Sequence, residues 1–294
     1  MAELPRISVI VPSFNQGTFI ERTLLSILGQ GYPDLEVIVI DGGSTDETIN
    51  VLERYSDQLT CWHSQPDRGQ ADAINRGMAI SSGQILCWLN SDDMFLPGTL
   101  LAVGSHLRDQ TERPKLLHGG AVTIAEENGE LRSGVQSSQP FDCTRLTCSN
   151  FIVQPSSFWT RPLWQGTGEL NIRYQYILDW DWFLRASRVP GFEADYLPRF
   201  LSLYRYHAQH KTSSGGEKRR QEIMELIRTH ASPYWQNLYS AIDRSYPQIQ
   251  HTATRLEKLG LPGRTRLLPW LIPNVRSHLK SAQDFYTVLF TFGW

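Results

Sequence analysis

The first 90 residues alternate short apolar runs with amphipathic segments, and this rhythm limits the folds that the chain can adopt. The runs span Ile7–Val11, Val37–Ile40, Leu59–His63 and Ile85–Leu89, and the first two are rich in β-branched residues. Nearly continuous apolar character is typical of strands that are buried on both faces of a sheet. Strands that alternate with helices favour a parallel sheet covered by helices on both sides. The sequence therefore predicts an α/β fold with a mainly parallel central sheet.

The segments between the apolar runs carry the start signals of helices. Thr18 with Glu21, and Ser44 with Glu47, match the spacing of a capping box, in which two side chains satisfy the first backbone N–H groups. We expect helices to begin at Thr18 and Ser44, and a third helix to span Ala71–Ile80. The first of these helices places four apolar side chains on one face: Ile20, Leu24, Ile27 and Leu28.

Polar side chains follow each of the predicted strands. Asn15 follows the first apolar run, Asp41 the second, Asp67 the third, and Asp92 and Asp93 the fourth. The carboxyl ends of parallel strands meet at one edge of a sheet, and ligands of open α/β sheets bind beyond that edge. We therefore expect these polar side chains to converge on one binding site.

The segment Asn90–Asp93 is the first candidate for chemistry. Its adjacent carboxylates, Asp92 and Asp93, repel each other unless a cation lies between them. Hard oxygen ligands suit Mg²⁺ or Mn²⁺, which can bridge the protein and the phosphates of a substrate. The alternative is that the pair caps a helix that begins near Pro97. Spacing alone leaves both interpretations open.

The chain beyond Asp93 has weaker signals. We expect strands within Leu116–Ile124 and Phe151–Thr160, and a helix over Ile177–Arg188. The run Ser213–Gly216 consists of serine and glycine, which is typical of a linker. After this linker, an amphipathic helix is expected over Glu217–His230.

Asp179 and Asp181 lie two positions apart in a predicted helix, so their side chains do not face each other. A carboxylate in a tryptophan-lined cleft can have a raised pKa and act as a general base on a substrate hydroxyl. The alternative is an ion pair with Arg185, which lies four residues after Asp181. We expect this ion pair for Asp181, whereas Asp179 stays a candidate base.

Arg205, His207 and His210 form another polar cluster. A guanidinium and imidazoles can hold a diphosphate, and a neutral imidazole can ligate a metal ion. The alternative is an ordinary polar loop that follows a strand.

Composition and motifs exclude several classes of protein. The formal net charge of −2 provides no bulk attraction to nucleic acid. Neither a GxGxxG nor a GxxxxGK[ST] motif occurs, which argues against a dinucleotide oxidoreductase and a P-loop NTPase. The four cysteines lack CxxC spacing, so we expect free, buried thiols and no zinc site. Neither a signal peptide nor a segment of membrane-spanning length is found, so we expect a cytoplasmic protein.

The tail from Arg255 onward is both basic and aromatic. Cations beside aromatic side chains are typical of a surface that contacts anionic lipid. The alternative is a segment that packs within the chain or in a homo-oligomer, and the sequence leaves both open. The residues concerned are Arg255, Lys258, Arg264, Arg266, Trp270, Arg276, Lys280, Phe285, Tyr286, Phe290, Phe292 and Trp294.

Three long motifs, in order, resemble glycosyltransferase family 2, in the branch of colanic-acid or capsule-type transferases. ISVIVPSFNQGTFIERTLLSILGQ resembles the opening strand and helix of that family, and VIVIDGGSTDET resembles its second strand and turn. QPDRGQADAINRGMAISSGQILCWLNSDD resembles the stretch that leads to the family's metal motif. The resemblance runs from Ile7 to about Thr212, which favours the metal interpretation of the acidic pair over the helix cap.

The resemblance implies a GT-A type nucleotide-binding fold at residues 1–214 and a C-terminal helical extension at residues 215–294. The nucleotide-sugar half would cover about residues 1–100 and the acceptor half about residues 101–214. The family's reaction inverts the anomeric centre: a base deprotonates the acceptor hydroxyl, which attacks in one in-line step while metal-bound diphosphate leaves. The implied partners are Mn²⁺ or Mg²⁺, a UDP-, GDP- or dTDP-linked sugar, and a glycan or polyprenyl-linked acceptor at the inner face of the membrane.

The resemblance also implies roles for individual residues. Asp93 would be the direct metal ligand, Asp92 would contact the ribose or the metal, and Asp179 would be the catalytic base. His207 resembles a position near the diphosphate that can ligate the metal. The positions that resemble the family's nucleotide-sugar-binding residues are Pro12, Phe14, Asn15, Asp41, Asp67, Gln70, Asp92 and Arg205.

The chain departs from the family's pattern at several positions. Gly42 stands where the family often has a second acidic residue, and Leu178 precedes Asp179 in place of glutamate. No QxxRW motif occurs, which argues against a processive synthase. A catalytically silent sugar-nucleotide-binding protein is the alternative, although the retained carboxylates argue against it. A nucleotidyltransferase would need a glycine-rich phosphate loop near the N-terminus, and the sequence has none.

Overall fold

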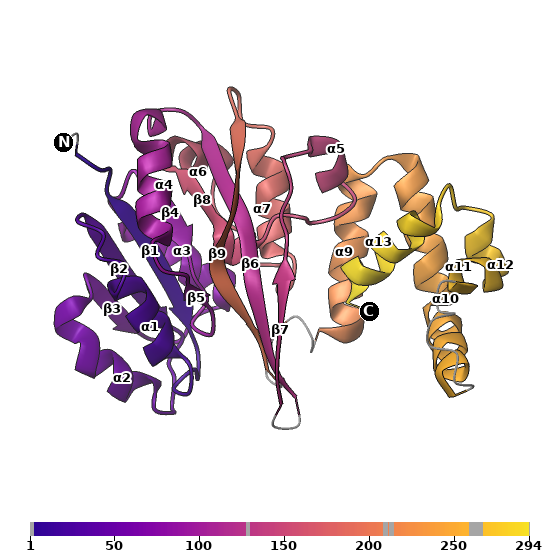
Figure 1. Cartoon of the computed structure of the whole chain (residues 1–294), viewed down its shortest axis with the longest axis horizontal. Coiled ribbons are helices and arrows are strands. Elements are labelled where there is room, and N and C mark those ends of the chain that lie inside the picture. Colours follow the sequence, from indigo (N-terminus) through magenta and orange to yellow (C-terminus); the bar gives the residue numbers. More distant parts are fainter. Residues whose placement is uncertain (1–2, 128–129, 208–210, 212–214, 259–266, 294) are drawn as a thin grey trace. The chain divides into compact units, whose positions relative to one another are not determined.

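The computed structural model describes residues 3–127, 130–207, 211, 215–258 and 267–293. The chain divides into two compact units (Figure 1). Unit 1 comprises Met1–Phe141 and Phe151–His210, and unit 2 comprises Asp142–Asn150 and Lys211–Trp294. His210, Ser213 and Ser214 lie outside the described residues, whereas Gly215 and Gly216 of the expected linker form the N-cap and the first residue of the helix Gly216–His230. The expected domain boundaries stay a prediction.

Unit 1 is built around a mixed sheet that has nine strands in the described part of the chain (Figure 1). The strand order is β3-β2-β1-β4-β8-β6-β9-β5, and β7 pairs with β6. The strands are β1 (Ile7–Ser13), β2 (Leu35–Asp41), β3 (Cys61–Ser64), β4 (Ile85–Trp88), β5 (Met94–Phe95), β6 (Lys115–Glu127), β7 (Glu130–Gln136), β8 (Ser157–Thr160) and β9 (Glu193–Tyr206).

The first four strands form the parallel part of the sheet, as the apolar runs predicted. Val9 of β1 lies opposite Val37 of β2 and Cys87 of β4, and β3 joins the far edge of β2 in the same direction. Beyond β4 the sheet is mixed, because β8 runs antiparallel to both β4 and β6 while β9 runs parallel to β6. The helix-and-strand rhythm stops at Asp93, where only a turn separates β4 from β5. β5 pairs antiparallel with β9 at the other edge of the sheet, so it does not extend the parallel part. The α/β class is confirmed.

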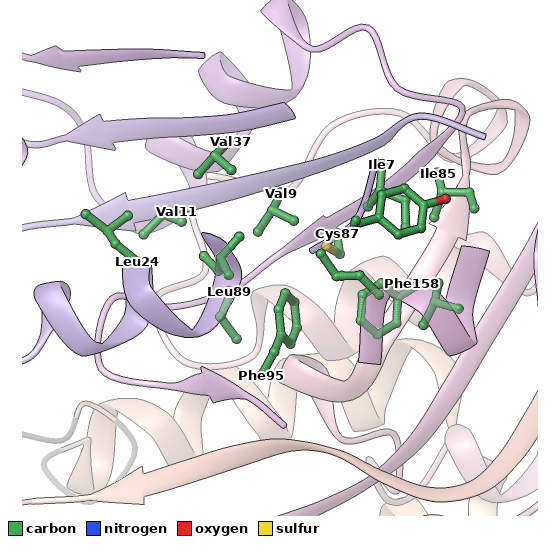
Figure 2. Packing of buried hydrophobic residues seen from close by; sticks show 14 of the residues in the cluster. Ile7, Val9, Val11, Leu24, Val37, Ile85, Cys87, Leu89, Phe95 and Phe158 are labelled. Carbon is green, nitrogen blue, oxygen red and sulfur yellow. The ribbon is translucent and has the colours of Figure 1, made fainter. Parts of the chain in front are cut away.

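Helices cover both faces of the parallel strands. A buried cluster fills the space between these strands and three helices on one side (Figure 2). There, Val9 and Val11 of β1 lie with Leu24 of α1. On the other side α3 packs on β1 and β2, so closely that a Cβ on Gly77 would clash with Ile10. The helices of unit 1 include α1 (Ile20–Leu28), α2 (Thr48–Tyr55), α3 (Gln70–Ile80), α4 (Thr99–Leu107), α6 (Arg161–Thr167) and α7 (Leu178–Ala186).

Four tryptophans join α6 and α7 to the sheet. The Trp159 ring of β8 lies 5.2 Å from that of Trp88 and 4.8 Å from that of Trp182 on α7. Trp164 of α6 stacks on Trp182 at 5.5 Å, and Trp182 Nε1 donates to the Gly168 carbonyl at 3.0 Å. All four rings are buried, so they are core residues that hold α7 in place.

Both expected capping boxes are wrong. Helix α1 begins at Ile20 and α2 at Thr48, and neither has a side-chain cap from its N-cap residue. Glu21 instead contacts Tyr55 Oη and Arg54, at 3.0 and 3.2 Å. Ser44 is held by Asp41 and by the backbone of Asn15, so it belongs to the loop before α2. Glu21 and Ser44 therefore have other partners than the N-termini of α1 and α2.

Two further expectations need correction. Of the expected strand Phe151–Thr160, only Ser157–Thr160 is a strand, and Gln154–Ser156 forms a 3₁₀ turn that contains Pro155. Proline lacks the N–H that a central strand needs. The four cysteines are free, but only Cys87 and Cys148 are buried. Cys61 is half-buried and Cys143 is exposed.

Unit 2 is helical, which confirms the expected C-terminal helical region. The expected helix over Glu217–His230 is present as α9, and Phe285, Phe292 and Tyr239 are among the buried residues of this unit. In the described residues no helix is both long and apolar enough to span a bilayer. The helices are α5 (Cys143–Leu146), α9 (Gly216–His230), α10 (Pro233–Lys258), α11 (Leu268–Leu271), α12 (Pro273–Arg276) and α13 (Ala282–Phe292).

Candidate active site

The end of β2 holds a fully buried carboxylate, Asp41. Its Oδ2 atom accepts from the backbone N–H of Gly43 at 3.0 Å and of Ser44 at 2.8 Å, and from Ser64 Oγ at 2.7 Å. Its Oδ1 atom accepts from Ser44 Oγ at 2.5 Å. Four donors neutralise much of the cost of burying this charge. Asp41 therefore shapes the loop that follows β2.

The loop after β1 is tied to the loop after β2. Asn15 has a positive φ of 52°, a conformation that asparagine tolerates better than most residues. Its N–H donates to Ser44 Oγ at 2.7 Å, and its Oδ1 accepts from Thr45 N–H at 3.0 Å. Pro12 lies within β1 and is buried, opposite Ile40 of β2. Hydrogen bonds thus join the loops at the carboxyl ends of β1 and β2 into one rim of the sheet.

An exposed aromatic ring and a carboxylate flank Gly42 on this rim. The Phe14 side chain is 60% exposed, which is unusual for a large apolar residue. A Cβ on Gly42 would lie 2.9 Å from Asp67 Oδ2 and 3.3 Å from Phe14 Cδ2. The other oxygen of Asp67 accepts from Gly69 N–H at 2.7 Å. Asp67 Oδ2 therefore occupies the space into which a second acidic side chain at position 42 would extend.

The turn Asn90–Asp93 is hydrogen-bonded to helix α1. The buried Thr23 hydroxyl lies 2.9 Å from the Ser91 carbonyl and 2.7 Å from the Asp93 carbonyl. The Asp93 N–H donates to the Asn90 carbonyl at 3.0 Å, which closes the turn. Helix α4 begins at Thr99 with Gly98 as its N-cap, and β5 comes between. The alternative that the acidic pair caps a helix is therefore wrong.

Asp93 is almost completely buried, at 1% exposure, beside a second carboxylate. Its Oδ1 accepts from Arg205 N–H at 3.1 Å and its Oδ2 from Asn90 Nδ2 at 3.3 Å, so neither bond is short. Burial, together with the charge of Asp92, raises the pKa of Asp93 well above its ordinary value. A carboxylate in this position gains stability when a cation balances its charge.

The end of β9 brings Arg205 and His207 to the acidic turn. His207 Nε2 lies 3.0 Å from Asp92 Oδ2, and Arg205 Nε donates to the Asp92 carbonyl at 3.0 Å. The Phe19 ring lies 4.4 Å from the His207 ring and 5.2 Å from Arg205 Cζ. Both side chains are therefore packed against the loop before α1 as well as bonded to the turn.

Gln70 connects helix α3 to the same turn. Its Nε2 donates to Asn90 Oδ1 at 2.7 Å, so Gln70, Asn90 and Asp93 form one chain of hydrogen bonds. Gly69 precedes Gln70, and a Cβ there would lie 3.4 Å from Gln175 Nε2. The segment that leads into α7 therefore lies against the start of α3.

Asp179 and Asp181 differ in their surroundings, as expected. Arg185 Nε donates to Asp181 Oδ2 at 2.9 Å, so the expected ion pair of Asp181 is confirmed. Asp179 lies in the first turn of α7 and is half-buried. It follows Gln175 by four residues, at the end of the segment that reaches Gly69.

Protein side chains alone do not form a closed metal centre in this structure. Within the described residues, no group of three or more His, Cys, Asp or Glu side chains is arranged to hold a metal ion. The donor set at the acidic turn nevertheless has the right chemistry, with carboxylates from Asp92 and Asp93 and an imidazole from His207. Mg²⁺ and related cations commonly take one or two protein carboxylates and complete their coordination with substrate phosphates and water.

The predicted site residues therefore fall into two groups. Asp92, Gln70, Arg205 and His207 surround Asp93, while Phe14, Asn15, Asp41 and Asp67 lie on the loops after β1, β2 and β3. Thr23 and Phe19, which support the acidic turn and the Arg205–His207 pair, are not among the predicted site residues. Thr23 had one available signal, because it is a hydroxyl on the apolar face of α1, three residues after Ile20.

Comparison with known proteins identifies the family. The family described as Glycosyl transferase family 2 matches residues 8–113. An uncharacterized glycosyltransferase of Mycobacterium tuberculosis is 42% identical over 191 residues, which cover 64% of this chain and 71% of that protein. A PGL/p-HBAD biosynthesis glycosyltransferase of Mycobacterium bovis is 29% identical over 203 residues, covering 68% of this chain and 77% of that protein.

Solved structures share the fold at low sequence identity. The mannosyltransferase PcManGT from Pyrobaculum calidifontis, in complex with GDP-Man and Mn²⁺, has a TM-score of 0.61 at 17% identity, covering 100% of this chain and 88% of that chain. S. aureus TarS 1-349, in complex with UDP-GlcNAc, has a TM-score of 0.55 at 17% identity, covering 98% of this chain and 91% of that chain. These neighbours are GT-A glycosyltransferases, so the expected GT-A type fold is confirmed. Together with the family match and the 42% identical relative, they establish that the chain is an enzyme of glycosyltransferase family 2.

Proposed function

We propose that this glycosyltransferase is metal-dependent and inverting. We further propose that it moves one sugar from a nucleoside-diphosphate sugar to a hydroxyl of a glycan or lipid-linked acceptor. The observation that carries the proposal is the buried carboxylate of Asp93, whose pKa is raised by burial and by Asp92. A second carboxylate beside a buried one is unfavourable without a cation, whereas it suits a site that binds a metal–diphosphate complex.

Mn²⁺ or Mg²⁺ is the proposed cofactor, with Asp93 as its direct ligand and Asp92 and His207 beside it. When bound, the cation supplies positive charge to the departing diphosphate. Arg205 lies against the same turn, where its guanidinium can pair with phosphate oxygens. The Mn²⁺ and GDP-Man in the complex of the structural neighbour PcManGT support this assignment.

The nucleoside is proposed to bind over the loops after β1, β2 and β3. The exposed Phe14 ring offers an apolar face for the base, and Asp67 Oδ2 offers an acceptor for an N–H group of the base. Asp67 would thereby replace the acidic side chain that the family often has at position 42. Asp41 would act through the shape of its loop, because its oxygens already accept four bonds.

Asp179 is the proposed catalytic base. Its carboxylate would take the proton from the acceptor hydroxyl as the oxygen attacks the anomeric carbon and the nucleoside diphosphate leaves. The half-buried position at the start of α7 supports this role, because the neighbouring segment reaches Gly69 and the start of α3. The chain belongs to an enzyme family, and it retains both the Asp92–Asp93 pair and Asp179. These facts favour catalysis over silent sugar-nucleotide binding.

A ligand screen tests the donor and the metal together. We expect UDP, GDP or dTDP to raise the melting temperature of the protein in the presence of Mn²⁺, and we expect EDTA to remove that increase. The temperature shift should be largest for one of the three nucleotides, which then identifies the donor class. An equal shift with Mn²⁺ and with EDTA would contradict metal-dependent binding.

Substitution of Asp179 tests the base. We expect Asp179→Asn to lower the transfer rate by about 10³-fold, while the dissociation constant of the sugar nucleotide stays within a few-fold. Asp181→Asn is the matched control, because it lies on the same helix and pairs with Arg185. Normal turnover in Asp179→Asn, measured as release of nucleoside diphosphate, would disprove the assignment.

A further inference from the structure

Helix α11 in unit 2 is apolar on two faces. Leu268 is fully buried. Ile272, which lies between α11 and α12, and Val275 of α12 are buried as well. Leu267, Trp270 and Leu271 have the i, i+3, i+4 spacing that places side chains on one face of a helix. These three side chains are 46%, 49% and 48% exposed. One face of α11 is therefore packed in unit 2, and the other is left open.

The exposed apolar side chains of unit 2 are concentrated at this helix. In the described residues of the unit, the large apolar side chains with high exposure are these three and Phe290 of α13. Neighbouring apolar side chains left exposed on a folded protein mark a surface that contacts another protein or a membrane. The other tail aromatics do not share this property, because Phe285 and Phe292 are core residues of unit 2.

The surroundings of α11 are cationic. Arg276 ends α12, which lies beside α11 and α10, and Lys280 follows four residues later (Figure 1). Both side chains are exposed, and no ion pair with a carboxylate is found for either within the described residues, although Lys280 Nζ lies 4.2 Å from the centroid of the Tyr234 ring. Asp284 is the one acidic residue of the segment 267–293. It accepts from Tyr234 Oη at 2.5 Å and from Ser281 N–H at 3.2 Å.

We propose that the open face of α11, together with the exposed cations Arg276 and Lys280 of the segment that follows it, docks on an anionic lipid surface. Tryptophan and leucine in a short helix suit the boundary between head groups and acyl chains, and nearby cations are attracted to anionic head groups. A second copy of the chain is a poorer occupant. The three side chains expose roughly 300 Å², whereas a stable interface buries about 800 Å² on each partner.

Vesicle flotation tests this proposal with the full chain. We expect the protein to float with vesicles of phosphatidylcholine that contain phosphatidylglycerol, and to bind vesicles of phosphatidylcholine alone far less. The double variant Trp270→Ser/Leu271→Ser should lower the partition coefficient at least tenfold. Leu131→Ser is the matched control, because Leu131 is 72% exposed on β7 of unit 1, and its binding should stay within twofold of the wild type.

A second variant tests the cations without touching the apolar face. Arg276→Gln/Lys280→Gln should lower binding to the anionic vesicles by about fivefold for each charge removed, and binding should also fall as salt increases. Thermal unfolding of each variant checks that it is folded, which is expected because all four side chains are exposed.

Three outcomes would overturn the proposal. These are a wild-type protein that does not float with anionic vesicles, a Trp270→Ser/Leu271→Ser variant that floats like the wild type, and a wild-type dimer in sedimentation that this variant dissociates. The last result would assign the face to a second copy of the chain. The proposal does not rest on the proposed metal or base, so nucleotide binding measured by thermal shift should be unchanged in every variant.

Discussion

Asp41 at the end of β2 and Asp93 after β4 are both buried carboxylates at the same edge of the sheet, but their surroundings differ. Asp41 accepts four hydrogen bonds at 2.5 to 3.0 Å. Asp93 accepts two, at 3.1 and 3.3 Å, and has Asp92 beside it. Burial and that neighbour raise the pKa of Asp93, whereas Asp41 has its charge balanced by donors.

The difference indicates two kinds of acidic residue in one site. A buried carboxylate with many donors stabilises the fold, because the donors replace the water that it lost. A buried carboxylate with few donors and a like charge nearby is costly, so it marks a place where a ligand completes the environment. The comparison therefore favours a loop-shaping role for Asp41 and supports the proposed cation binding at Asp93.

The largest expected effect comes from removing the charge of Asp93. Asp93→Asn should lower kcat/KM by about 10³-fold if Asp93 is the proposed direct ligand, because the metal would then be lost from the departing diphosphate. Its stability without metal should be unchanged or higher, since an unfavourable charge is removed. Transfer rates and urea unfolding of the same preparation measure both quantities. A variant that is active but unstable would reverse the assignment of the two carboxylates.

Asp41→Ala should instead act mainly on the fold. Four hydrogen bonds to the carboxylate are lost, and each contributes about 1 kcal/mol to stability, so the free energy of unfolding should fall by about 4 kcal/mol. Urea denaturation measures the change. If Asp41→Ala kept full stability and lost only nucleotide affinity, Asp41 would contact the nucleotide directly. The proposed difference between Asp41 and Asp93 would then be wrong.

His118 is a buried titratable residue with one hydrogen-bond partner, so it should make the stability of the fold depend on pH. His118 on β6 is fully buried; its Nδ1 lies 2.7 Å from Ser138 Oγ, and its Nε2 meets no partner among the described residues. Burial lowers the pKa of His118 from its ordinary value of 6.5 to about 4.

The sign of the pH effect follows from that lowered pKa. Above pH 6.5 the imidazole is neutral in both the folded and unfolded states, so it adds no pH dependence. Between pH 6.5 and 4 the unfolded chain binds the proton first, so the free energy of unfolding should fall by about 3 kcal/mol. His118→Gln should flatten this part of the stability curve. An unchanged slope, measured by urea unfolding at several pH values, would contradict the role of His118.

The smallest effect is expected from the support below the acidic turn. Thr23→Val removes the hydroxyl that lies within 2.9 Å of the Ser91 and Asp93 carbonyls, at a cost of about 1 kcal/mol in stability. Metal-dependent nucleotide binding should weaken by a few-fold, because Asp93 is held less firmly. Thr23→Ser, which keeps the hydroxyl, should restore both quantities. Equal behaviour of the two variants would show that the hydroxyl is not the support.

Much of the fold was predictable from local patterns. The four apolar runs became the parallel strands, α3 and α9 lie within a residue of their expected bounds, and the Asp181–Arg185 pair formed as its spacing indicated. The two capping boxes failed because long-range contacts use two of their side chains. Glu21 bonds to Tyr55 of α2, and Ser44 bonds to Asp41 and to the backbone of Asn15.

The sequence by itself determined the α/β class, the family and the acidic turn, because apolar periodicity and contiguous motifs are local properties of the chain. Only the tertiary structure decided how that turn is surrounded. Arg205 and His207 reach Asp93 and Asp92 across separations of 112 and 115 residues, and Thr23 reaches the same turn across 70. Such contacts depend on strand order and helix packing. For the same reason, only the folded chain could distinguish Asp41, which has its donors, from Asp93, which has too few.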